Sequence, residues 1–143
     1  MGHGTIILKV GPDTLIGYQH LGTGEQPEKS GILVQEGEPI EPGTPIGIVG
    51  NTGHVISTAG GDGTHLHVFV IDVSERNPEI KKLKFRADSG DRGAETKLGK
   101  IKAAFKDAVS AKDSKQRDAA IRNLIFNNQE LIYMNPWEAI WTH

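Results

Sequence analysis

The spacing of apolar positions changes near residue 80 and divides the chain into two stretches. In the first stretch, short runs of apolar and β-branched residues alternate with turns rich in glycine and proline, which is the pattern of short β-strands. The runs cover residues 5–10, 14–20, 31–37, 45–50 and 65–73. Strands of this length and spacing predict a compact, mostly antiparallel β domain over residues 1–78.

In the second stretch, apolar residues recur at the spacing of an amphipathic helix. One set is Leu98, Ile101, Phe105 and Ala108, and a second set is Ile121, Leu124 and Ile125. Asp113 precedes the second set and has Gln116 three residues later, as in an N-terminal capping box. We therefore expect an antiparallel helical hairpin within residues 79–130.

Two further segments flank this hairpin. Residues 81–95 are strongly charged and include Gly90 and Gly93, so we expect them to form an exposed, mobile loop. Residues 131–143 form a tail with two tryptophans, which we expect to dock on the β domain. The predicted fold class is therefore α+β, a mostly antiparallel β domain with an inserted helical hairpin.

The composition argues against several classes of function. The chain has 143 residues and a net charge of −2, so we expect no nucleic-acid partner. It contains no cysteine, so any metal ligand must be a histidine, an aspartate or a glutamate. No apolar run approaches the length of a membrane span, and no charged segment followed by an apolar run marks a secretory signal.

His65 and His67 stand one residue apart in the last predicted strand. Side chains at alternate positions of a strand point to the same face, so the two imidazoles would project together. Imidazole is a good zinc ligand and titrates near neutral pH, so this pair could belong to a zinc hydrolase site. Taken alone, the pair is equally compatible with two solvent-facing histidines that carry no chemistry.

Four motifs in a fixed order extend the picture beyond this pair. They are Gly17-Tyr18-Gln19-His20-Leu21, the spaced glycines and apolar residues from Val34 to Gly47, Gly50-Asn51-Thr52-Gly53, and Thr64-His65-Leu66-His67. In order and approximate spacing they resemble the lysostaphin/LytM-type zinc metallopeptidases, which cut peptide cross-links of bacterial cell walls. The resemblance covers residues 2–73 and implies a partial LytM-like β domain.

The resemblance also implies roles for three histidines. His67 matches a zinc ligand of the family, and His20 and His65 match two catalytic histidines beside the metal. Zinc is thus the implied cofactor, and the peptide part of peptidoglycan is the implied substrate. The implied location is the cell envelope, the extracellular space or a virion.

One part of the family pattern is missing from the chain. Family members carry two further zinc ligands on a His-x-x-x-Asp motif upstream of the Tyr-x-His hairpin, and this sequence contains no such motif. A catalytic zinc normally has three protein ligands, so His67 alone would bind zinc weakly. The chain would then be a fragment, a degenerate relative, or a polypeptide completed by a partner chain or by a missing upstream segment. Retention of His20 and His65 favours a truncated or split peptidase.

Other functions remain open at the level of the sequence. A non-catalytic cell-wall-binding, regulatory or phage structural domain could keep the fold without a complete zinc site. A biotinyl- or lipoyl-type carrier barrel shares the spaced valine, glycine and isoleucine pattern, but the hairpin tips here lack the lysine that such a carrier displays. The loop at 54–63 is longer than in the family, and its His54 or Asp62 could reach a substrate or a metal.

Overall fold

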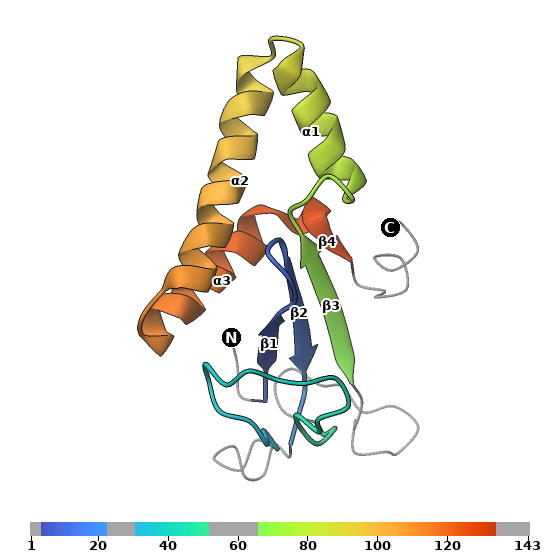
Figure 1. The fold of residues 1–143 in the computed structure, drawn as a ribbon, viewed down its shortest axis with the longest axis vertical. Helices are drawn as coiled ribbons and strands as arrows, with labels where there is room; N and C mark the ends of the chain where they lie inside the picture. Colours follow the sequence, from blue (N-terminus) through green and yellow to red (C-terminus); the bar gives the residue numbers. More distant parts are fainter. Residues whose placement is uncertain (1–3, 23–30, 52–65, 134–143) are drawn as a thin grey trace. The chain divides into compact units, whose positions relative to one another are not determined.

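The computed structural model describes residues 4–22, 31–51 and 66–133. Its strands are β1 (Ile6–Lys9), β2 (Thr14–Gln19), β3 (His67–Asp72) and β4 (Ile132–Tyr133). They form one antiparallel sheet in the order β1-β2-β3-β4 (Figure 1). Its helices are α1 (Pro78–Asp88), α2 (Arg92–Ser110), α3 (Ser114–Asn127) and the short 3-10 helix η2 (Gln129–Leu131). The α+β class is therefore confirmed.

The first two strands form the hairpin that the sequence predicts. The backbone N–H of Val10 donates to the carbonyl of Thr14 at 2.8 Å, which closes the turn. Gly11 in this turn has a φ of +73°, a conformation that glycine adopts without steric strain. The predicted strand positions at 5–10 and 14–20 are thus confirmed to within a residue or two.

The predicted strands at 31–37 and 45–50 form only isolated bridges instead of continuous strands. Ile32 pairs with Gly47 in one antiparallel bridge, and Leu21 pairs with Val49 in the other. The connecting segment contains Pro39, Pro42 and Pro45. Proline has no N–H to donate to a ladder, so this composition interrupts strand pairing that the apolar pattern alone would favour.

The expectation of a mobile loop at 81–95 was wrong, because α1 occupies most of that segment. Asn77 caps the helix by accepting a hydrogen bond from the N–H of Glu79 at 3.1 Å, and Pro78 takes the first helical position. Ile80 and Leu83 supply the buried side chains of the helix. Two apolar anchors among many charges were too few to reveal a helical period, although the Asn-Pro cap was readable.

The two predicted helices correspond to α2 and α3. Asp91 caps α2 by accepting from the N–H of Ala94 at 3.1 Å, and Asp113 caps α3 by accepting from the N–H of Gln116 at 2.8 Å. The predicted apolar positions of α2 are buried, namely Leu98, Ile101, Phe105 and Ala108. In α3, the buried positions are Ile121 and Leu124. Each large apolar side chain that is fully buried contributes about 1.5–3 kcal/mol, so these rows stabilise the helical region.

The beginning of the predicted tail joins the sheet. In β4, Ile132 pairs with Ile71 and Tyr133 pairs with Val70 of β3. The buried side-chain amide of Asn77 donates to the carbonyls of Asp72 at 2.8 Å and Leu131 at 3.2 Å, which ties the start of α1 to η2. The tryptophans of the tail lie outside the described residues.

The chain divides into two compact units. One consists of Met1, Leu8–Ile16 and Phe69–His143 and includes α1, α2, α3 and η2, whereas the other consists of Gly2–Ile7 and Gly17–Val68. Within the described ranges, none of the helices is long and apolar enough to cross a membrane.

Candidate functional site

Two of the three predicted site histidines lie next to each other. His20 follows the last residue of β2, and His67 is the first residue of the neighbouring strand β3. Their ring centroids are 5.7 Å apart, and the ring planes make an angle of 19°. Both residues are half-buried and belong to the same compact unit. Residues far apart in the sequence thus form one imidazole pair at adjoining strand ends.

The backbone at His20 has an unusual conformation. Its φ is +66°, which makes it the only residue other than glycine with a positive φ in the described part of the chain. The left-handed region costs a residue with a Cβ about 1 kcal/mol or more. Such conformations persist where surrounding contacts impose them, and they are concentrated at functional sites.

Backbone hydrogen bonds hold His20 from both sides. Its carbonyl accepts from the N–H of Gly50 at 2.9 Å, and the N–H of the next residue, Leu21, donates to the carbonyl of Gly4 at 2.9 Å. Leu21 is also buried, with 3 % of its surface exposed. The segment around Gly50 therefore fixes the direction in which the His20 side chain leaves the backbone.

Close approach of backbones next to His20 requires glycine. A Cβ added to Gly50 would lie 1.6 Å from the carbonyl oxygen of Gly22, a distance that no rotamer change can relieve. A Cβ added to Gly31 would lie 2.8 Å from the backbone nitrogen of the same Gly22. Gly50 opens the Gly-Asn-Thr-Gly motif, so this motif has a steric reason to begin with glycine: it lets the backbone pass directly against the segment that carries His20.

Further backbone hydrogen bonds close this crossing. Gly22 donates to the carbonyl of Ile48 at 2.8 Å and accepts from the N–H of Asn51 at 2.8 Å. Ile48 in turn donates to the carbonyl of Gly31 at 2.8 Å. We call Gly22, Gly31 and Gly50 the glycine crossing. It links the Tyr-x-His segment to Gly50 and Asn51, the described part of the Gly-Asn-Thr-Gly motif, without using side chains.

The described residues provide only part of a zinc ligand set. The 5.7 Å separation is short enough for both imidazoles to approach one small ion or one water molecule. However, no group of three histidine, aspartate or glutamate side chains placed to hold a metal exists in the described ranges. His65, His54 and Asp62 lie outside those ranges, so the predicted placement of His65 beside His67 stays a prediction.

Asp72 is a buried carboxylate that the sequence did not single out. It ends β3 and is 1 % exposed. Its Oδ1 accepts from the N–H of Ser74 at 2.8 Å, and its Oδ2 lies 3.4 Å from Nε of Arg76. These partners hold the turn that leads from β3 to α1. The role of Asp72 is therefore structural.

No protein-family model, curated protein or solved structure matches the chain. The likeness to the LytM-type peptidases accordingly depends on the four sequence motifs. The structure adds the proximity of two of the histidines in those motifs and the glycine contacts between two of the motif segments.

Proposed function

We propose that this chain supplies part of a LytM-like active site. The complete site would hydrolyse cell-wall peptide cross-links with the help of zinc. The observation that carries the proposal is the 5.7 Å pairing of His20 with His67. Each histidine belongs to a different motif of the resemblance, and a chance match of motifs gives no reason for their imidazoles to meet. The positive φ of His20 adds support, because a strained histidine next to a second histidine is typical of a functional site.

In this proposal, the three histidines have distinct tasks. His67 would be a zinc ligand, and bound zinc would lower the pKa of a water molecule and polarise the scissile carbonyl. His20, half-buried at the end of β2, would accept or donate a proton or a hydrogen bond at the reacting groups. His65, two residues before His67 in the sequence, would have the same task, as the resemblance implies. The remaining zinc ligands would come from an upstream segment or from a partner chain.

A second function follows from the incomplete ligand set. Within the described ranges, no carboxylate and no further imidazole lies where it could complete a metal site with His20 and His67. A domain that binds cell-wall peptide, regulates another hydrolase or serves as a structural part of a phage would not need one. The peptidase assignment and this alternative differ in what zinc binding and turnover should show.

Zinc titration of purified variants tests the proposed roles. We expect weak, substoichiometric zinc on the wild-type chain, no site-specific zinc on His67→Ala, and a zinc affinity within about threefold of wild type on His20→Ala. His143→Ala removes an imidazole outside the four motifs and should leave binding unchanged. A loss of zinc in His20→Ala equal to that in His67→Ala would contradict the role given to His20.

Turnover is tested after the missing ligands are supplied. An upstream segment with a His-x-x-x-Asp motif, joined to the chain or added as a second polypeptide, should restore tight zinc and release of peptide from purified peptidoglycan. His20→Ala and His65→Ala should then lower turnover by two or more orders of magnitude, since general acid–base groups accelerate reactions about 10²–10⁴-fold. Both variants should keep the zinc. A reconstituted, zinc-loaded protein that cuts no cell-wall peptide would favour the binding or structural alternative.

A further inference from the structure

The charge of the chain is distributed unevenly. Residues 78–110, which include α1 and α2, contain nine lysines and arginines and five aspartates and glutamates, a formal charge of +4. The net charge of the whole chain is −2, so the other residues together carry −6. The net charge of the chain argued against a nucleic-acid partner. A sum over all residues, however, does not reveal that these two helices are basic. Local positive charge attracts acidic partners and raises their rate of association.

A pocket of about 660 Å³ lies on this basic pair of helices, bounded by α1, the start of α2 and η2. Its lining combines Pro78 and two glutamates, Glu79 and Glu130, with four cationic and two apolar side chains, namely Lys81, Lys82, Arg86, Lys97, Leu83 and Phe85. Its volume is in the range of protein ligand sites. We call these six residues the basic pocket.

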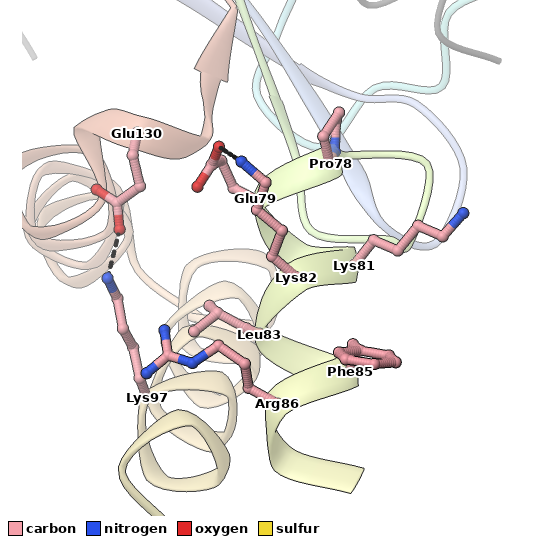
Figure 2. Close-up of a pocket in the computed structure, with 9 residues that line it drawn as sticks. All are labelled: Pro78, Glu79, Lys81, Lys82, Leu83, Phe85, Arg86, Lys97 and Glu130. Atoms are coloured by element: carbon pink, nitrogen blue, oxygen red, sulfur yellow. Dashed lines mark hydrogen bonds and ion pairs between the residues drawn. The ribbon is translucent and has the colours of Figure 1, made fainter. Parts of the chain in front are cut away.

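The basic pocket extends over two sides of α1. Figure 2 shows Leu83 and Arg86 on the side that faces Lys97 and Glu130, whereas Lys81 and Phe85 project from the other side. A ligand that contacts all of these groups must be extended. An extended peptide meets this requirement better than a compact small molecule does.

The three lysines of the basic pocket can change partners at low cost, whereas Arg86 donates two hydrogen bonds, at 2.8 and 3.0 Å, to Oδ2 of Asp91, the residue that caps α2. Lys82 Nζ lies 3.4 Å from Glu79 Oε1, and Lys97 Nζ lies 2.9 Å from Glu130 Oε1. These pairs are partly solvent-exposed, and exposed ion pairs contribute little to stability. Within the described ranges, Lys81 has no carboxylate partner. Carboxylates of an incoming chain could therefore bind here without the loss of strong internal contacts.

Phe85 adds an apolar component to this surface. Its side chain is 74 % exposed, so contact with an apolar group of a ligand would remove a large apolar surface from water. Phe126 on α3 is 81 % exposed but lines a different, smaller pocket in which Arg122 is the only cation. The exposure of Phe85 therefore coincides with a cluster of positive charge, and that of Phe126 does not.

We propose that the basic pocket is a docking site for an acidic peptide segment of a partner protein that carries an aromatic or aliphatic anchor residue. Lys81, Lys82 and Lys97 would pair with acidic residues of the segment, and Phe85 and Leu83 would contact the anchor. Arg86 would add positive charge to the site while it stays paired with Asp91. A polyanion without apolar groups would leave Phe85 exposed, so the charge and the apolar lining together favour a peptide. This site is independent of the histidine pair.

Fluorescence anisotropy with short labelled peptides tests the docking site on the whole chain. The main probe has one phenylalanine flanked by glutamates, and two matched probes replace the phenylalanine by serine or the glutamates by lysines. We expect the main probe to bind with salt-sensitive affinity and each matched probe to bind at least about tenfold more weakly. Lys81→Glu and Phe85→Ser should each lower the affinity for the main probe about tenfold. Lys81→Glu removes a charge contact, and Phe85→Ser removes an apolar contact.

Matched variants on α3 provide the controls. Lys115→Glu makes the same charge change on an exposed residue away from the pocket, and Phe126→Ser removes the other exposed phenylalanine. Both should bind the main probe within about twofold of wild type. Equal losses in Lys81→Glu and Lys115→Glu would overturn the proposal in favour of non-specific attraction, and equal binding of the serine probe would indicate a polyanion site. Self-association that Lys81→Glu abolishes would assign the pocket to a second copy of the chain instead, and no binding of the main probe at about 1 mM would exclude the docking site.

Discussion

The surroundings of the histidine pair and the helical region are held together by different kinds of contact. Next to His20, the glycine crossing brings main chains together at distances that a Cβ would not permit. In the helices, order comes from buried side chains such as Ile101 and Leu124, and from capping residues at the helix starts. An added methyl group should therefore lower the stability most next to His20, and a shortened side chain should lower it most in the helices.

Gly50→Ala should cause the largest change of the substitutions considered. The added methyl group meets the carbonyl oxygen of Gly22 at 1.6 Å, so the segment must move and the His20–His67 pair should separate. We expect a loss of unfolding free energy of about 3 kcal/mol or more, at the upper end of overpacking effects. Denaturant unfolding measures the loss, and the imidazole proton signals of the two histidines in NMR spectra report the pair.

Gly99→Ala is the matched control for this substitution. Gly99 lies within α2, and nothing within 4 Å would meet the added methyl group. Alanine is the better helix former, so we expect a gain of about 0.5–1 kcal/mol. If both glycine substitutions changed stability by the same amount and sign, the close approach at Gly50 would be refuted.

Leu124→Ala should cause the next largest effect, in the helical region. Leu124 is completely buried, and truncation of such a leucine leaves a cavity that costs about 2–5 kcal/mol. Leu33→Ala shortens a leucine that is 55 % exposed and should cost less than about 1 kcal/mol. Chemical denaturation followed by circular dichroism would measure both. A cost for Leu33→Ala that equals that of Leu124→Ala would contradict the burial seen in the helices.

Substitutions at His20 examine the backbone separately from the imidazole. Glycine tolerates a φ of +66°, whereas valine at that angle is strongly disfavoured. We expect His20→Gly to keep or slightly raise the unfolding free energy and His20→Val to lower it, with a difference of about 1–2 kcal/mol between them. Thermal unfolding of the two variants side by side gives this difference. Equal stability would mean that His20 adopts an ordinary conformation in solution.

The sequence predicted the elements that follow one periodic pattern. The hairpin of β1 and β2, the strand that begins near His67 and the buried row from Leu98 to Ala108 all show a clear alternation or a clear helical period. The helix α1 was missed because only Ile80 and Leu83 are buried among its charges. The segments at 31–37 and 45–50 were misread as strands because their glycines, Pro45, and the prolines between the segments weaken the ladder but leave the apolar pattern intact.

The candidate site was predictable in part. The motif order placed His20 and His67 in one site, and the structure brings their rings to 5.7 Å. The positive φ of His20 and the contact between Gly50 and Gly22 depend on segments distant in the sequence, so no local pattern could reveal them. The basic pocket was hidden by the net charge, because counting over the whole chain averages the helices with the acidic remainder.

The smallest expected effect concerns the ion pair between Lys97 and Glu130 at the basic pocket. The hydrogen bond from Lys97 is the main reason that the pKa of Glu130 lies below its ordinary value of 4.5, with smaller contributions from a backbone hydrogen bond and from the charge of Lys97. A carboxylate whose pKa is lowered by folding stabilises the fold above its unfolded pKa, and this contribution is lost as the pH falls through the folded pKa.

The ion pair between Lys97 and Glu130 is partly exposed, so we expect Lys97→Met to reduce the unfolding free energy by less than about 1 kcal/mol at neutral pH. Below the lowered pKa of Glu130, the variant and the wild type should be equally stable, because the carboxyl is protonated in both. Urea unfolding at neutral pH and at a series of falling pH values would measure both differences. A deficit that stayed constant down to the lowest pH at which the chain is folded would assign the effect to the packing of the Lys97 side chain instead of the ion pair.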